Sequence, residues 1–376
     1  MLCSLPGQNK PGCPQYYLAL LRPHGFETHR SSSHPDIDIN DLPDPDPDKY
    51  RQDLYHVISS RHETELGKCR LRTGIGKPSI FDGIPRILKL PTCFGGNLMH
   101  QPLINLTELH LDLWCTRPKA WKFDRFSHWP WAVLEGETWV RHGAAVAAAA
   151  KHLPTSFGRI PWNPQLKVSS GYKAWEFLYY ICGLGPAVFF NILPEPYYLH
   201  FCKLVRVVRI VFQRTISWEQ LLEMNTLLLQ WCTEFELIYC QRDPNRLHFV
   251  RPCVHSLTHL ARESHRLGPL MLSAQWTMER VIGYVGTLLK QPSNLFCNLS
   301  AQMKHLAYKN AIVAMWPEFE IQKENPRGCR DFGDGYQLLG PKDVDLYQLP
   351  DMEETALNNF CSGEPDSEDI ERRSLY

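Results

Sequence analysis

Three consecutive segments in the middle of the chain, residues 172–183, 196–213 and 217–240, repeat apolar side chains at the three-to-four spacing of an α-helix. In the last segment Leu228 and Phe235 belong to a broad apolar face, and Ser217 precedes Glu219 and Gln220 as a candidate N-cap. A run of helices of this length leaves little of the middle of the chain for a sheet. The pattern therefore predicts a helical assembly.

Helical spacing also extends toward the N-terminus. Residues 49–72 show it, and so do residues 98–113, where Pro102 lies near the expected first turn. Strand-like alternation is scarce, so the predicted fold class is mainly α. Any small sheet is expected to involve the segments flanking residues 73–95 or 250–275.

The two ends of the chain differ in composition from its middle. Residues 1–50 are rich in Pro, Gly, Ser and Asp, which predicts a flexible arm. Residues 341–376 contain ten acidic and three basic side chains, which predicts a solvated, largely disordered tail. Residues 51–340 are expected to form the folded body, and a hydrophobic content of 44% can fill its core.

Bulk properties exclude several classes of protein. The sequence contains no run of about 18 apolar residues and no signal-peptide pattern, so a soluble, non-secreted protein without a membrane partner is expected. The 13 cysteines are an odd, scattered set that favours reduced thiols. A GxxxxGK[ST] loop is absent, which argues against nucleotide hydrolysis. The net charge is zero, but the acidic end leaves the remainder mildly basic, a weak indication of a phosphate-bearing partner.

Three constellations could support chemistry. His255 and His259 have the i, i+4 spacing of zinc ligands on a helix, but they form a partial ligand set, and structural histidines are the alternative. Glu279 lies among bulky apolar residues on an expected helix and needs a partner, which could be Arg280, another basic residue or a metal; a salt-bridged helix glutamate is the alternative. Asn97 follows two glycines at an expected helix start, where it could be an N-cap.

The order of several segments resembles transposases of the CACTA and Kyakuja-Dileera-Zisupton type. The first match, residues 3–21, has the sequence CSLPGQNKPGCPQYYLALL, and the second, residues 73–86, has the sequence TGIGKPSIFDGIPR. The combination in order is more specific than any one match. The remaining matches are residues 93–114, 153–178, 252–260, 268–286 and 334–339.

The resemblance implies a ribonuclease-H-like core interrupted by a helical insertion, in which acidic residues hold two Mg²⁺ or Mn²⁺ ions for phosphodiester cleavage. A remnant of this α/β core is therefore expected beside the helices. Glu279 matches the acid of the family's Glu-Arg motif and would be a metal ligand. Asn97 occupies the position of the Asp in the family's Asp-x-Met-His motif, and its neutral amide should weaken metal binding. His259 matches the family's His-Leu pair.

Family members place further catalytic elements before the region that matches residue 3, so the resemblance implies a truncated, catalytically impaired transposon-derived product that is inactive alone. DNA, full-length transposase or a second copy would be its partner. A nuclear location is expected, or a cytoplasmic one in the absence of a targeting signal. Two other functions stay open: a non-catalytic binding module, and a metal-dependent hydrolase built on His255 and His259.

Overall fold

The computed structural model describes residues 7–8, 16–17, 20–24, 37–84, 89–116, 124, 126–153, 159–168, 171–289, 293–320, 329–333, 336–338, 355 and 358. Contacts divide the chain into unit 1, Met1–Gly283, and unit 2, Tyr284–Tyr376. The boundary lies within the helix Trp276–Leu288, inside the expected body of residues 51–340. Across the described residues, no helix is both long and apolar enough to cross a lipid bilayer.

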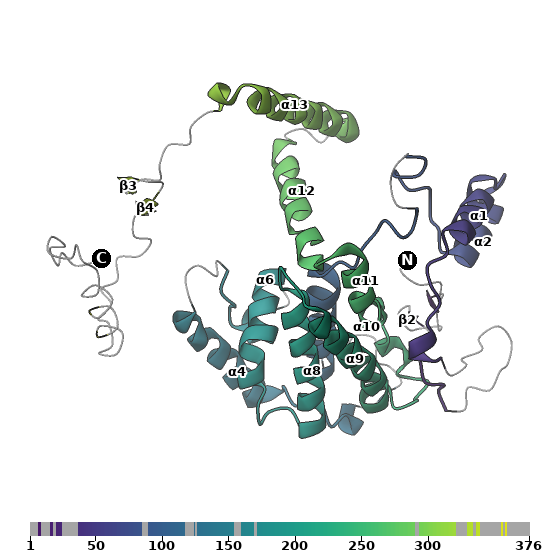
Figure 1. Cartoon of the computed structure of the whole chain (residues 1–376). Helices are drawn as coiled ribbons and strands as arrows, with labels where there is room; N and C mark the ends of the chain where they lie inside the picture. Colours follow the sequence, from purple (N-terminus) through teal and green to yellow (C-terminus); the bar gives the residue numbers. More distant parts are fainter. Residues whose placement is uncertain are drawn as a thin grey trace. The chain divides into compact units, whose positions relative to one another are not determined.

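Unit 1 consists mainly of helices, as Figure 1 shows, and the mainly α prediction is confirmed. Its longer helices are α1 (Pro47–Ile58), α2 (Glu63–Thr73), α3 (Leu106–Trp114), α4 (Gly136–Ala149), α8 (Glu195–Val211), α9 (Trp218–Phe235), α11 (Leu260–Leu267) and α12 (Trp276–Leu288), the last of which ends in unit 2. The short α-helices are α5 (Pro164–Lys167), α6 (Ala174–Phe177), α7 (Gly185–Val188) and α10 (Pro252–Leu257). Three π-helical segments, η2 (Met99–Asn105), η6 (Leu178–Leu184) and η7 (Glu236–Cys240), adjoin α3, α6 and α9.

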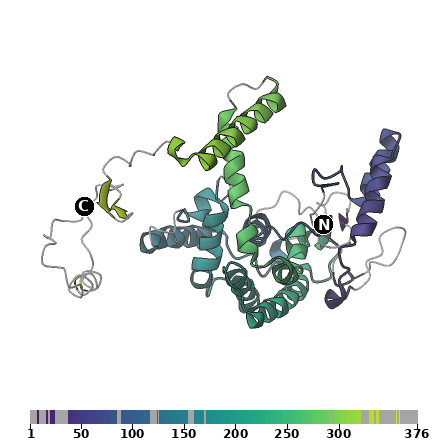
Figure 2. The same cartoon turned by 45° about the horizontal axis from the view of Figure 1, so that its top comes forward.

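The core of unit 1 is built around α8 and α9, which pack along one another, with α11 against α9. Figure 2 shows the helices of this unit from a second side, and no broad sheet lies among its coloured, described segments. Aromatic rings fill much of the interior, and the indole N–H of Trp114 donates to the Tyr239 hydroxyl at 3.0 Å. This bond satisfies a polar atom that would otherwise be buried without a partner. The largest fully buried rings are Trp114, Trp131, Trp231, Tyr180, Tyr239, Phe177, Phe189, Phe201, Phe235 and Phe249.

The three helical segments predicted in the middle of the chain are confirmed as α6 with η6, α8, and α9 with η7. Ser217 caps α9 as predicted, because its hydroxyl accepts the Gln220 N–H at 3.2 Å and the Gln220 side chain accepts the Ser217 N–H at 2.9 Å. This reciprocal arrangement is a capping box, which satisfies two backbone donors at the helix start.

The helical stretch expected at residues 49–72 is two helices, α1 and α2, which pack against one another and are separated by residues 59–62. The helix expected at 98–113 is confirmed as η2 followed by α3. Its first part is π-helical around Pro102, which has no N–H to donate to the preceding turn.

An N-terminal segment is tied to unit 1 by hydrogen bonds from its backbone. The N–H groups of Leu20 and Leu21 donate to the two carboxyl oxygens of Glu236, each at 2.8 Å, and the His24 N–H donates to the Arg242 carbonyl at 2.8 Å. Glu236 is buried, and burial raises the pKa of its carboxyl group to about 7 against the opposing effect of these two bonds. A buried side chain of η7 thus holds a segment 216 positions away in the sequence.

The expectation for the location of a small sheet is wrong for the described residues. The elements that flank residues 73–95, α2 and η2, are helical, and so are those that flank residues 250–275, η8 (Leu247–Phe249) and α12. Strands occur instead as two antiparallel pairs, β1 (Gly7–Gln8) with β2 (Tyr16–Tyr17), and β3 (Arg330–Gly333) with β4 (Tyr336–Leu338). No sheet of the ribonuclease-H type occurs in the part of the chain that the structure describes, because helical periodicity extends through the segments that would have to supply its strands.

Unit 2 contains the end of α12, the helix α13 (Leu295–Met315) and the β3–β4 pair. No residue of α13 is buried, and its apolar side chains include Phe296, which is 83% exposed. The expected acidic tail, residues 341–376, lies outside the described residues except for Thr355 and Asn358.

Candidate functional site

The glycine-rich turn at residues 94–100 positions Asn97 at the start of η2. Gly95 lies close to α11, because a Cβ at this position would be 2.6 Å from Leu267 Cδ1, and a larger residue would have to displace that side chain. Asn97 Oδ1 then accepts the backbone N–H of His100 at 3.2 Å. This bond is of the N-cap type that the sequence predicts for Asn97, which lies one residue before Leu98, the cap position of η2.

The first turn of α12 positions Gln275 and Glu279. Trp276 stacks on Trp175 of α6, with ring centroids 4.8 Å apart and an interplanar angle of 21°, and it also meets Phe212 edge-on at 5.7 Å. The Glu279 N–H donates to the Gln275 carbonyl at 2.9 Å, so these two side chains stand one helical turn apart. The stacked indole rings therefore anchor the turn that carries both polar groups.

Four side chains from these two segments meet and form what we call the Asn97 cluster: Asn97, His100, Gln275 and Glu279. Asn97 Nδ2 lies 2.8 Å from Gln275 Oε1, to which it donates, and 2.7 Å from His100 Nδ1. Since this amide nitrogen is a donor, His100 Nδ1 is the acceptor and the ring proton of the neutral imidazole resides on Nε2. His100 Nε2 lies 3.6 Å from Glu279 Oε1. The cluster joins segments that are 178 positions apart in the sequence.

The donor set of the Asn97 cluster limits its chemistry. Glu279 is its only carboxylate, and the side chains of His100 and Glu279 are 36% and 45% exposed, so ions from solution can reach them. The amide nitrogen of Asn97 is a donor and cannot bind a cation. Mg²⁺ prefers oxygen ligands and is usually held through one or two carboxylates. These residues fit one weakly held cation, and they do not fit a two-metal centre. In the described ranges, no three or more His, Cys, Asp or Glu side chains gather around one point.

The second pair of candidate residues, His255 and His259, forms a direct contact. His255 lies in α10 and His259 follows it, and their Nε2 atoms are 3.2 Å apart, so one ring donates to the other. Both rings are buried, and burial lowers the pKa of each to about 4. A neutral, mutually bonded pair is the geometry expected of structural histidines. A zinc site would need at least one further protein ligand, and the described residues bring none to this pair.

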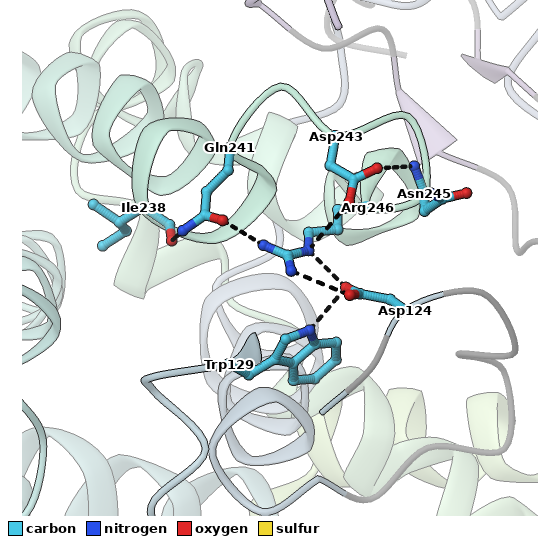
Figure 3. Close-up of polar contacts among 7 residues, drawn as sticks. All are labelled: Asp124, Trp129, Ile238, Gln241, Asp243, Asn245 and Arg246. Atoms are coloured by element: carbon cyan, nitrogen blue, oxygen red, sulfur yellow. Dashed lines mark hydrogen bonds and ion pairs between the residues drawn. The ribbon is translucent and has the colours of Figure 1, made fainter. Parts of the chain in front are cut away.

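A polar network that the sequence did not reveal joins the turn after η7 to Asp124 (Figure 3). Arg246 Nε and Nη2 donate to the two oxygens of Asp124 at 2.6 and 3.1 Å, and Trp129 Nε1 donates to the same carboxylate at 2.8 Å. Arg246 Nη1 also donates to Gln241 Oε1 at 2.6 Å. The side chains of Arg246 and Asp124 are each 6% exposed. This arrangement leaves the guanidinium no room for a ligand, so the network is structural.

Two members of the Asn97 cluster, His100 and Gln275, were not singled out by sequence reasoning. Both lie within the segments that contain the candidate residues, at 94–100 and 275–283. The signal in the sequence was that His100 and Gln275 are polar and lie within one helical turn of Asn97 and Glu279. This spacing could not show that the two segments contact one another.

Comparison with known proteins gave no match: no protein-family model, curated protein or solved structure is detectably similar to this chain.

Proposed function

We propose that the chain is a transposon-derived protein related to cut-and-paste DNA transposases of the CACTA and Kyakuja-Dileera-Zisupton type, with an impaired metal centre at the Asn97 cluster. One observation carries the proposal. The two residues that the resemblance assigns to metal binding, Asn97 and Glu279, were chosen from separate motifs, and both belong to one cluster through His100 and Gln275. This contact between the two motifs supports the proposal.

The identity of residue 97 supports impairment of the metal centre. An aspartate at this position would give the cluster a second carboxylate, on the side of His100 away from Glu279. Asparagine instead donates to His100 Nδ1 and to Gln275 Oε1, so its amide nitrogen serves the hydrogen bonds of the cluster. Mg²⁺ or Mn²⁺, when bound, would supply the Lewis-acid chemistry of phosphodiester cleavage. In the present sequence only Glu279 could hold it by charge.

The ribonuclease-H-like origin of the fold stays part of this proposal because the resemblance implies it. Its support comes from sequence order alone, since the described residues form no sheet with more than two strands. A nuclear location and DNA as a partner belong to the proposal on the same ground.

The test combines metal binding with cleavage. Mn²⁺ affinity is measured by electron paramagnetic resonance, and nicking of supercoiled plasmid is followed with Mg²⁺ or Mn²⁺. We expect no nicking by the natural chain and weak Mn²⁺ binding. Asn97→Asp removes the amide that donates to His100 Nδ1. Once the His100 ring turns from its place between residue 97 and Glu279, two carboxylates can hold one ion, so Mn²⁺ should bind at least about tenfold more tightly. Glu279→Gln added to Asn97→Asp should abolish this gain.

Glu219→Gln is the matched control, because Glu219 is also a glutamate in the first turn of a long helix and lies in α9, outside the cluster. It should leave Mn²⁺ affinity unchanged. Efficient nicking by the natural chain that Glu279→Gln abolishes would show that the centre is intact and the proposed impairment wrong. Equal Mn²⁺ affinity of the natural chain, Asn97→Asp and the double variant would remove the proposal that this cluster is a metal centre.

A further inference from the structure

Helix α13 of unit 2 exposes apolar side chains that a folded protein normally buries. None of its 21 residues is buried by the described part of the chain, and Phe296 and Met315 are 83% and 66% exposed. The other large apolar side chains that are well exposed on this helix are Leu295, Met303, Tyr308 and Ile312. Its sequence contains no acidic residue. A long apolar surface of this kind marks an interaction site.

A seam of residues spaced alternately four and three positions apart runs along nearly the whole length of α13. The six positions of this seam are Leu295, Leu299, Gln302, Leu306, Lys309 and Val313. Their mean spacing of 3.5 residues is the period at which two long helices pack along one another. Lys304 and Ala311 lie on the opposite face of the helix, about 170° from the centre of the seam at 100° for each residue.

The seam is complementary to a second copy of itself in the antiparallel direction. Its positions alternate between a and d of a heptad, and in an antiparallel pair each a position lies beside a d position of the partner. When two α13 helices cross at residue 304, the facing pairs are Leu295 with Val313, Leu299 with Lys309, and Gln302 with Leu306. Each polar residue of the seam therefore meets a leucine.

The charges of the seam also favour the antiparallel direction. The stem of Lys309 can pack on the partner's Leu299 while its ammonium group reaches water. The two copies of Lys309 are then ten residues apart along the axis, or about 15 Å. A parallel pair would instead place one Lys309 directly beside the other, where like charges repel.

We infer that α13 pairs with the α13 of a second copy of the chain and forms an antiparallel two-helix interface. A two-fold interface uses the same surface of both copies, and the seam meets this requirement. A lipid surface fits α13 less well, because a helix that lies on a membrane keeps its charges away from its apolar face, and Lys309 lies within the seam. The interface belongs to unit 2 and does not depend on the Asn97 cluster or on the proposed function.

Size-exclusion chromatography of the full chain with multi-angle light scattering tests this interface. We expect the mass of two chains at micromolar concentration. Leu306→Glu places a charge in both central layers of the pair and should raise the dissociation constant of the dimer at least about tenfold. The matched control is Ala311→Glu, which adds the same charge to the opposite face of the same helix and should leave the dimer intact. Neither position is buried, so neither substitution removes core packing.

A second measurement tests the direction of the pair. The natural chain is labelled with ¹⁵N and mixed with Lys309→Glu, and native mass spectrometry counts the mixed dimers. An antiparallel pair should give the statistical proportion, whereas an excess of mixed dimers would show that residue 309 faces itself and that the antiparallel pairing is wrong. A monomeric natural chain would overturn the inference, whether lipid vesicles bind α13 or residues 341–376 cover it. Equal loss of the dimer in Leu306→Glu and Ala311→Glu would also overturn it.

Discussion

The buried Arg246–Asp124 pair shows how much a single charged side chain can contribute to this fold. Replacing Arg246 with methionine leaves the Asp124 carboxylate, which is 6% exposed, with the Trp129 indole as its one remaining donor among the described residues. We expect the free energy of unfolding to fall by about 3–5 kcal/mol, as is usual when one partner of a buried pair is removed. Urea denaturation followed by tryptophan fluorescence measures this change.

Two further variants test whether the loss of stability comes from the burial of an unpaired charge. Arg206→Met removes an equally bidentate pair with Glu223, but both side chains are well exposed, so stability should change little. Arg246→Met with Asp124→Asn removes both charges and should be less destabilised than Arg246→Met alone. A double variant at least as unstable as the single one would show that the pair's charges are not the cause.

Residue roles were predictable where they depend on neighbours in the sequence. Asn97 bonds to the backbone of the first helical turn, as its glycine-rich turn predicts. Glu279 is 45% exposed, so its carboxylate does not need the partner expected of an acid among apolar residues, although His100 Nε2 lies 3.6 Å from it. Which residue lies beside Glu279 was not predictable. His100 comes from a distant segment, and nothing in the spacing of either motif shows that the two segments meet.

At the scale of the helix, the capping box of α9 gives a local test of helix stability. Ser217→Ala removes the hydroxyl that accepts the Gln220 N–H, and we expect the free energy of unfolding to fall by about 1 kcal/mol. Ser217→Thr keeps the hydroxyl that accepts from Gln220 and donates to Glu219, and should retain most of the stability. Thermal unfolding followed by circular dichroism compares the three proteins. An unchanged melting temperature in Ser217→Ala would mean that α9 is held by packing alone.

Helices were the elements best predicted, because α8 buries one face along most of its length and α9 does so from Met224 onward, and both repeat apolar residues regularly. Their interruptions were not predictable in the same way. The break between α1 and α2 and the π-helical geometry around Pro102 depend on which backbone hydrogen bonds the surroundings allow. The sheet locations were wrong because strands of two to four residues carry no periodic signal.

The whole molecule should lose stability in acid because several histidines are buried in its core. Burial lowers the pKa of His110, His142, His255 and His259 to about 4, and that of His200 to about 3. In the unfolded chain these rings take up protons near pH 6.5, which favours unfolding at lower pH. We expect stability to fall as the pH drops from 6.5 to about 4, by up to about 2 kcal/mol for each histidine at pH 5.

Glu236 acts in the opposite direction. Its pKa is raised from 4.5 to about 7, so its contribution to stability is present at low pH and is lost as the pH rises through this range. One carboxyl group cannot offset five histidines. Glu236→Gln should therefore make the loss of stability in acid steeper, when urea midpoints are measured between pH 4 and 8. Urea midpoints that stay constant over this range would contradict the expected ionisation of the core.

The contact between Glu236 and the N–H groups of Leu20 and Leu21 also bears on the order in which the protein folds. Most packing in unit 1 joins helices that follow one another closely, and such contacts form quickly because little chain must be closed into a loop. Closing the long loop between residues 20 and 236 costs more entropy and needs η7 in place to receive the segment. The N-terminal segment should therefore dock last, after α8 and α9 have assembled, and a ribosome must release most of unit 1 before that docking can occur.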